Sequence, residues 1–149
     1  MITNTYLNFD GNSEDAFSFY KSVFGGEFDT VMKFKDTPGG EEMSSDAGNR
    51  IMHISLPLGN GQFLMASDTL TGNKLIVGNN VSISLSPESR EEADRIFNGL
   101  SAGGMVQMPL HDAFFGYFGH LRDKFGIQWM VSVSTAEDPR NGGSAKQFI

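Results

Sequence analysis

Apolar side chains alternate with polar ones along residues 5–9 and then recur every three or four residues within 13–28. This change of period from about two to about 3.6 predicts a strand followed by a helix. Ser13 is the predicted N-cap, because its hydroxyl can accept a hydrogen bond from the first helical turn. Gly25-Gly26 is predicted to end the helix.

The same pattern returns 77 residues later, with a strand at 82–86 and a helix within 90–105 that is capped by Ser86 or Ser89. This shift aligns Thr5 with Ser82, Ala16 with Ala93, Tyr20 with Phe97, and Gly26 with Gly103. Each copy closes with a similar strand, at 61–67 and 126–132. Because one copy cannot bury its sheet alone, two copies are expected to enclose a shared interior.

The strands and helices predict two βαβββ modules in an α+β fold, with helices outside mainly antiparallel sheets. The predicted boundaries are 1–68 for module 1, 69–79 for a linker, 80–134 for module 2 and 135–149 for a frayed tail, all within one domain. Within module 1, the polar and glycine-rich segment 36–49 is predicted to be a mobile loop or a wide hairpin.

Successive residues of a strand point to opposite faces, so the closing strands can be divided into two sets. If the helices cover the large Leu64 and Trp129, then Met65 and Met130 face a concave interior; the opposite assignment is the alternative. The concave set would also contain Phe63, Ser67, Gln128 and Ser132.

The composition narrows the possible partners and compartments. A formal net charge of −7 disfavours nucleic-acid binding, since no basic stripe is available for phosphates. The chain has no cysteine, which fits a reducing cytoplasm. No apolar run approaches the ~18 residues of a membrane span. These features predict a soluble, cytoplasmic protein without nucleic-acid or membrane partners.

Three stretches resemble the vicinal oxygen chelate superfamily, which includes glyoxalases, bleomycin-resistance proteins and dioxygenases. They are YLNFDGNSEDAFSFYKSVFGGEF (6–28), MHISL to LMASD (52–68) and GGMVQMPLHDAFFGYFGHLRDKFGIQWMVSV (103–133). The likeness is strongest to the PhnB-like branch, whose members are often labelled demethylubiquinone methyltransferases. The resemblance implies a glyoxalase/bleomycin-resistance-like fold of paired βαβββ modules around a cleft, and a homodimer.

The resemblance also implies where a metal ion would bind, because enzymes of this superfamily take His and Glu ligands from the first and fourth strands of each module. Carried over by position, these places fall at Thr5, Met65, Ser82 and Met130. Hydroxyls and thioethers are poor ligands for divalent Zn, Ni, Mn or Fe, and neighbours such as Tyr6 are no better. We therefore expect no metal site and no cofactor.

Three polar residues are candidates for chemistry, each with a structural alternative. His53 could act as a hydrogen-bond donor or general base, or lie satisfied within its sheet. Asp68 could orient a ligand or pair with His53, or cap the turn into the linker. Gln128 carries an amide that needs partners if it is buried, whether water, a side chain or a small molecule.

A ligand-binding surface is also predicted on the concave side. The stretch AFFGYFG (113–119) packs sheets together or lines a slot for a flat ligand, with Phe115 as its candidate contact. The full set of candidate contacts is Thr5, Phe63, Met65, Ser82, Phe115, Gln128 and Met130.

Three functions follow from these residues. The first is a metal-free homodimer that binds a small apolar or aromatic molecule, as in bleomycin-resistance-type sequestration. The second is a divergent enzyme, a lyase, isomerase or dioxygenase-like protein, that uses His53, Asp68 or Gln128 for proton transfer. The third is a non-catalytic scaffold dimer with filled clefts.

Overall fold

The structure is a computed structural model that describes residues 1–70 and 72–134. The chain divides between Val77 and Gly78 into two compact units, called unit 1 and unit 2, and each is described by itself. Among the described residues, no helix has both the length and the apolar character that crossing a membrane requires.

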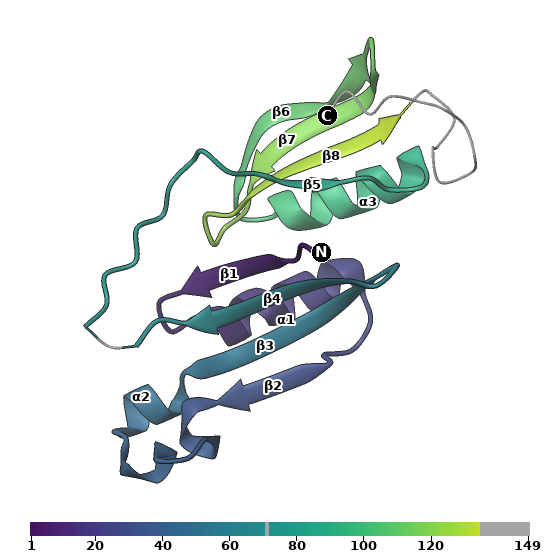
Figure 1. The fold of residues 1–149 in the computed structure, drawn as a ribbon. Helices are drawn as coiled ribbons and strands as arrows, with labels where there is room; N and C mark the ends of the chain where they lie inside the picture. Colours follow the sequence, from purple (N-terminus) through teal and green to yellow (C-terminus); the bar gives the residue numbers. More distant parts are fainter. Residues whose placement is uncertain (71, 135–149) are drawn as a thin grey trace. The chain divides into compact units, whose positions relative to one another are not determined.

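Unit 1 is a four-stranded sheet with one long helix along it (Figure 1). Its main elements are β1 (Thr5–Phe9), α1 (Ser13–Phe24), β2 (Thr30–Lys33), β3 (Ile51–Gly59) and β4 (Gln62–Asp68). The strand order is β1-β4-β3-β2, in which β1 and β4 run parallel and the other pairs antiparallel.

Unit 2 repeats this topology with β5 (Ile83–Leu85), α3 (Arg90–Ser101), β6 (Met105–Ala113), β7 (Gly116–Arg122) and β8 (Gln128–Ser134). The strand order is β5-β8-β7-β6, again with a parallel first pair (Figure 1). The predicted α+β fold of two βαβββ modules is therefore confirmed. The predicted tail, 135–149, lies outside the described residues.

The segment 36–49, predicted to be a mobile loop or a wide hairpin, contains short helical elements. The connection from β2 to β3 contains two 3-10 turns, η1 (Phe34–Asp36) and η2 (Gly40–Glu42), and a short helix, α2 (Ser45–Asn49). The Ser44 hydroxyl accepts a hydrogen bond from the Ala47 amide and so caps α2. Polar side chains that suggest a loop also supply the caps of short helices.

One face of each sheet packs in the core. Leu64 and Ala66 of β4 are fully buried, as is Trp129 of β8. Their neighbours Met65 and Met130 are only half-buried on the opposite face of each strand. The prediction that the helices cover Leu64 and Trp129 is therefore confirmed, and Met65 and Met130 lie on the face that we call the open face of each sheet.

The strand register corrects the predicted position of Thr5. Thr5 pairs with Leu64, so its side chain shares the buried face, whereas Tyr6 pairs with Met65 and lies on the open face. In unit 2 the residue opposite Trp129 is Ile83, which lies 78 residues after Thr5. The helices repeat with a shift of 77, so the spacing from Thr5 to the start of α1 is one residue longer than the spacing from Ile83 to the start of α3.

The two long helices begin differently. The Ser89 side chain caps α3 by accepting a hydrogen bond from the Glu92 amide. Of the two predicted caps, Ser86 and Ser89, it is therefore Ser89 that caps the helix. The prediction that Ser13 caps α1 is wrong, because Ser13 is the first helical residue and Asn12 occupies the cap without a side-chain bond. The fully buried Ser13 hydroxyl has no hydrogen-bond partner among residues 1–70 and 72–134.

This difference predicts opposite effects of the same substitution. Ser89→Ala should lower the free energy of unfolding by about 1 kcal/mol, because a helix cap is lost. Ser13→Ala should leave it unchanged or raise it by up to about 1 kcal/mol, because an unsatisfied buried hydroxyl is removed. Urea denaturation followed by circular dichroism measures both. An equal loss in the two variants would contradict the unpaired state of the Ser13 hydroxyl.

Candidate functional site

The open face of unit 1 mixes apolar and hydrogen-bonding side chains. The strand pairing assigns its members as Tyr6, Asn8, Thr30, Met32, His53, Ser55, Phe63, Met65 and Ser67. Tyr6 is 45% exposed, whereas Ser55 is buried. This mixture of apolar surface with a few polar groups is the usual character of sites that bind small organic molecules.

A tyrosine–histidine pair lies on this open face. The Tyr6 hydroxyl lies 3.0 Å from His53 Nδ1, and the two rings are stacked with their centroids 5.7 Å apart. Tyr6 belongs to β1 and His53 to β3, so the tyrosine side chain reaches across β4. On the neighbouring strands, Met65 pairs with Tyr6 and Met32 pairs with His53. Met65 therefore lies on the strand between the two members of the pair, and Met32 lies on the strand beyond His53.

The open face of unit 2 carries a related contact. By strand pairing its members include Ser84, Phe118, His120, Arg122, Gln128, Met130 and Ser132, and Ser82 contacts His120 on this face. The Ser82 hydroxyl lies 3.3 Å from His120 Nε2, and His120 pairs with Met130. In both units, a hydroxyl from the first strand region therefore contacts a histidine of the third strand across the fourth.

Gln128 is buried, and other protein groups use both ends of its amide. Its Nε2 donates to the Val81 carbonyl at 3.0 Å, and its Oε1 accepts from Gln107 Nε2 at 3.5 Å. Of the alternatives considered for this amide, a side chain and a backbone group are the partners in this structure. The amide therefore ties the start of β8 to the chain before β5 and to β6.

Phe115 lies in the two-residue turn between β6 and β7. Its ring packs edge-on against Phe114 and Phe118, with centroids 5.1 and 5.5 Å apart. Phe118 also contacts His111 edge-on. This aromatic cluster lies at the hairpin end of unit 2, and nearly all of the Phe114 side chain is exposed.

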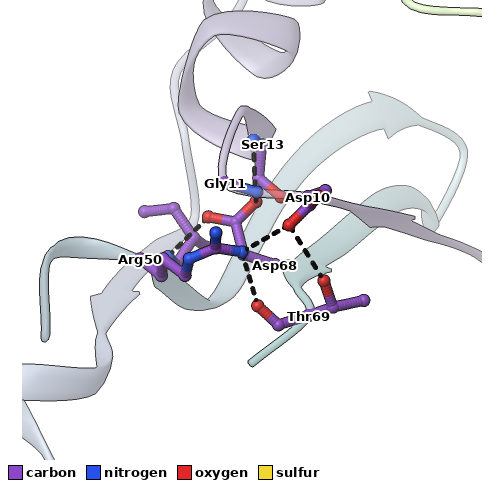
Figure 2. A network of polar contacts seen from close by, with 7 residues as sticks. Asp10, Gly11, Ser13, Arg50, Asp68 and Thr69 are labelled. Carbon is purple, nitrogen blue, oxygen red and sulfur yellow. Dashed lines mark hydrogen bonds and ion pairs between the residues drawn. The ribbon is translucent and has the colours of Figure 1, made fainter. Parts of the chain in front are cut away.

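Asp68 is the centre of a network at the end of β4 (Figure 2). Its Oδ1 accepts hydrogen bonds from the Gly11 and Ser13 amides at 3.1 and 3.0 Å, and its Oδ2 accepts from the Ile51 amide at 2.8 Å. Asp68 is 4% exposed. The carboxylate therefore joins β4 to the start of α1 and to β3, and it accepts hydrogen bonds from three backbone amides.

An arginine extends this network toward the surface. Arg50 Nη1 contacts Asp10 Oδ1 and the Thr69 carbonyl, each at 2.8 Å (Figure 2). Asp10 is well exposed, so this ion pair contributes little stability by itself. The arrangement supports a structural role for Asp68, close to the predicted turn cap.

Comparisons with known proteins identify the relatives of this chain. The model of the family described as 3-demethylubiquinone-9 3-methyltransferase matches residues 2–132. The chain belongs to this family. It is a PhnB-like member of the vicinal oxygen chelate superfamily. Protein YjdN of Escherichia coli strain K12 is 28% identical over 89% of this chain and 95% of its own length.

Solved structures of the family share the fold. Protein PA1353 from Pseudomonas aeruginosa is 38% identical, with a TM-score of 0.80 over 90% of this chain and 98% of its own. A PhnB protein from Bacillus cereus is 28% identical, with a TM-score of 0.73 over 90% and 100%. The fosfomycin resistance protein FosX from Listeria monocytogenes, at 14% identity and a TM-score of 0.61 over 92% and 95%, shares the fold alone.

The family's name describes a methyl transfer. The glycine pairs of this chain can be compared with the glycine-rich turns that bind nucleotide-like cofactors. Glycine-rich turns that bind nucleotide-like cofactors usually connect a strand to the start of a helix. The pairs Gly25-Gly26 and Gly103-Gly104 instead follow the ends of α1 and α3. Neither glycine pair is placed to bind a nucleotide-like cofactor in this way, and we derive no methyl-transfer step for this family member.

The residues on the open faces also bear on metal binding. With the observed register, the first and fourth strands place Tyr6 beside Met65 in unit 1 and Ser84 beside Met130 in unit 2. Thioethers and neutral hydroxyls are poor ligands for divalent metals of the first transition row. Within 1–70 and 72–134, no three His, Cys, Asp or Glu side chains are grouped closely enough to hold an ion.

Two groups with shifted pKa values lie near the start of α3. The pKa of Tyr117 is raised because its hydroxyl donates a hydrogen bond to Asp94 at 2.6 Å. The pKa of Arg90 is raised chiefly by its hydrogen bonds to Asp112, and its guanidinium stacks over the Tyr117 ring. These contacts join Arg90 and Asp94 of α3 to Asp112 and Tyr117 of the β6–β7 hairpin, so their role is to hold the helix against the hairpin.

Tyr6 is the functional candidate that the sequence did not single out. The predicted register placed Thr5 on the open face, which assigned Tyr6 to the core side. The available signal was the alternation along β1, where Leu7 and Phe9 are apolar while Tyr6 and Asn8 carry polar groups. This pattern favours Tyr6 on the solvent-accessible face.

Proposed function

We propose that this protein binds a small, largely apolar or aromatic molecule on the open face of unit 1, without a metal ion, and does so as a homodimer. The observation that carries the proposal is the Tyr6–His53 pair, with Met65 on the strand between the two residues and Met32 on the strand beyond His53. Methionine side chains adapt to irregular apolar ligands, and one well-placed polar pair can orient such a ligand. The absence of cysteine supports a cytoplasmic location for this activity.

The metal-free part of the proposal is supported by ligand chemistry. Tyr6, Met65, Ser84 and Met130 lie on the open faces of the first and fourth strands of the two units. None offers the imidazole or carboxylate group that Zn, Ni, Mn or Fe prefers.

The homodimer is supported by an exposed edge of unit 2. β6 is an edge strand, and its Met105, Val106 and Met108 side chains are 62, 45 and 44% exposed. Exposed apolar edge strands tend to pair with or pack against another chain.

The proposal predicts three results for protein purified without chelator. Elemental analysis should find no stoichiometric metal, and light scattering at micromolar concentration should give twice the chain mass. Toluene or indole should raise the thermal midpoint, by the equivalent of about 1.4 kcal/mol at ten times the Kd. Tightly held Ni, Zn, Mn or Fe at one per chain would favour a metal enzyme instead. A monomer would refute the dimer, and no stabilisation by any small molecule would favour a scaffold.

A further inference from the structure

We infer that the open face of unit 2 binds the carboxylate or phosphate group of a small organic anion, which the Arg122 guanidinium anchors. This site lies on the other unit from the proposed apolar site and uses different chemistry. Arg122 belongs to β7, is half-buried and lies on the open face. Within residues 1–70 and 72–134, its guanidinium forms no ion pair and no hydrogen bond.

The other arginines show that an unpaired guanidinium is unusual in this chain. In the part of the chain that the structure describes, Arg50, Arg90 and Arg95 each contact a carboxylate. The chain has 18 acidic residues against 11 lysines and arginines, so carboxylates are plentiful. A half-buried cation without a counter-ion loses hydration and gains nothing in return. An oxyanion from solution would supply the missing partner of Arg122.

The surroundings of Arg122 favour an anion. On the adjacent strands it pairs with Gln128 of β8 and Met105 of β6, and none of the residues that strand pairing places on this face is acidic. The neighbouring carboxylates are used elsewhere. Asp123 accepts hydrogen bonds at the β7–β8 turn and from the core, and Asp112 contacts α3 on the opposite face. The net charge of −7 therefore comes from other parts of the surface, and the local charge on this face is positive.

The guanidinium also matches the geometry of an oxyanion. Its planar fork can donate two parallel hydrogen bonds to two oxygens of a carboxylate or phosphate. Partial burial lowers the local dielectric and so strengthens such a pair relative to one in open water. A further donor lies on the next strand, because Gln107 uses one Nε2 hydrogen on Gln128 and has a second hydrogen available. The inference requires only the fork of Arg122.

The apolar residues on this face argue for an organic anion. Met105, the β6 partner of Arg122, is 62% exposed, and Met130 is half-buried on the open face of β8. Thioether side chains adapt to apolar and aromatic groups. The arrangement therefore fits a molecule that has a charged head group and an apolar body.

The experiment titrates the full chain, labelled with ¹⁵N at arginine, with benzoate, phenyl phosphate and benzamide at low salt. Benzamide has the shape of benzoate without its charge. Because hydrogen bonds between charged groups are the strong ones, we expect the better of the two anions to bind about tenfold more tightly than benzamide in calorimetry. The tighter anion identifies the head group. The Arg122 Nε resonance should shift with that anion and stay in place with benzamide, and Arg122→Gln assigns it.

Three variants separate the anchor from a general effect of charge. Arg122→Gln should reduce the preference for the anion to about twofold or less, and it should leave the thermal midpoint of the free protein unchanged because no internal partner is lost. Arg122→Lys keeps the charge without the fork and should give an intermediate preference. Arg95→Gln is the matched control, because it removes the same charge from α3 and should preserve the preference.

Equal affinity of the wild-type chain for benzoate, phenyl phosphate and benzamide, or binding of none of them, would overturn the anchor. An equal loss in Arg95→Gln and Arg122→Gln would also overturn it, since net charge alone would then explain the preference. A clear fall in the thermal midpoint of free Arg122→Gln would assign Arg122 a structural role instead. The site on unit 1 is tested separately, by its stabilisation with toluene or indole.

Discussion

Replacing Asp68 by alanine is expected to lower the free energy of unfolding by roughly 4 kcal/mol, because three amide N–H groups lose their acceptor and two of their hydrogen bonds are buried. The Gly11, Ser13 and Ile51 amides all donate to this one carboxylate, and it is 4% exposed. Water cannot easily take its place. The substitution therefore disconnects β4 from the start of α1 and from β3 at the same time (Figure 2).

Urea denaturation of the variant measures this loss, and amide hydrogen exchange at the three donors localises it. Asp68→Asn should also destabilise the chain, because its amide group turns one acceptor into a donor that faces an N–H. Asp10→Ala is the matched control, since Asp10 belongs to the same network but is exposed, and it should cost less than about 1 kcal/mol. A loss of under 1 kcal/mol for Asp68→Ala would show that the network does not hold unit 1 together.

The architecture could be predicted from the sequence because the spacing of apolar residues indicates each strand and helix, and because the strand–helix unit occurs twice. The alternation within β4 and β8 correctly assigned Leu64 and Trp129 to the core, since burial of large apolar groups dominates the choice of face. The repeated glycine pairs correctly marked the ends of the two helices. These predictions depend only on local sequence, so they do not require knowledge of how the strands pair.

Features that depend on a single-residue register were not predictable in the same way. A shift by one position exchanges the faces of a strand, and for this reason Thr5 was assigned to the open face that Tyr6 occupies. The hydrogen-bond donors to Asp68 likewise lie 17 to 57 residues away along the chain, so no short sequence motif indicates them. Ser13 lies where the sequence predicts a helix cap, yet its own backbone amide donates to the distant Asp68 carboxylate.

The candidate site shows the same division. The sequence offers His53 as a candidate for its imidazole group and Met65 for its place in the closing strand of module 1. The Tyr6–His53 contact joins residues 47 positions apart and crosses an intervening strand, so only the folded sheet brings the two rings together. Predicting this pair requires the correct register of β1, β4 and β3. An error of one residue in β1 therefore leaves Tyr6 out of the predicted site.

Asp123 is expected to have an effect on unit 2 as large as that of Asp68 on unit 1. Its Oδ1 accepts from the Phe125 and Ile127 amides at 2.8 and 3.0 Å, and its Oδ2 accepts from the Trp129 indole at 2.9 Å. Asp123 is 3% exposed and Trp129 fully buried. Asp123→Ala should therefore lower the free energy of unfolding by roughly 4 kcal/mol, since the β7–β8 turn and the indole both lose their acceptor.

The chain has one tryptophan, so intrinsic fluorescence reports on this site directly. Asp123→Asn keeps an oxygen for the two turn amides but can place an amide donor against the indole N–H, so it should change the native emission spectrum and cost roughly 2 kcal/mol. Asp112→Ala is the matched control, because that exposed carboxylate pairs with Arg90 at the surface and its loss should leave the emission unchanged. If Asp123→Asn has the emission and stability of the wild type, the indole does not depend on the carboxylate, and the turn amides alone account for its burial.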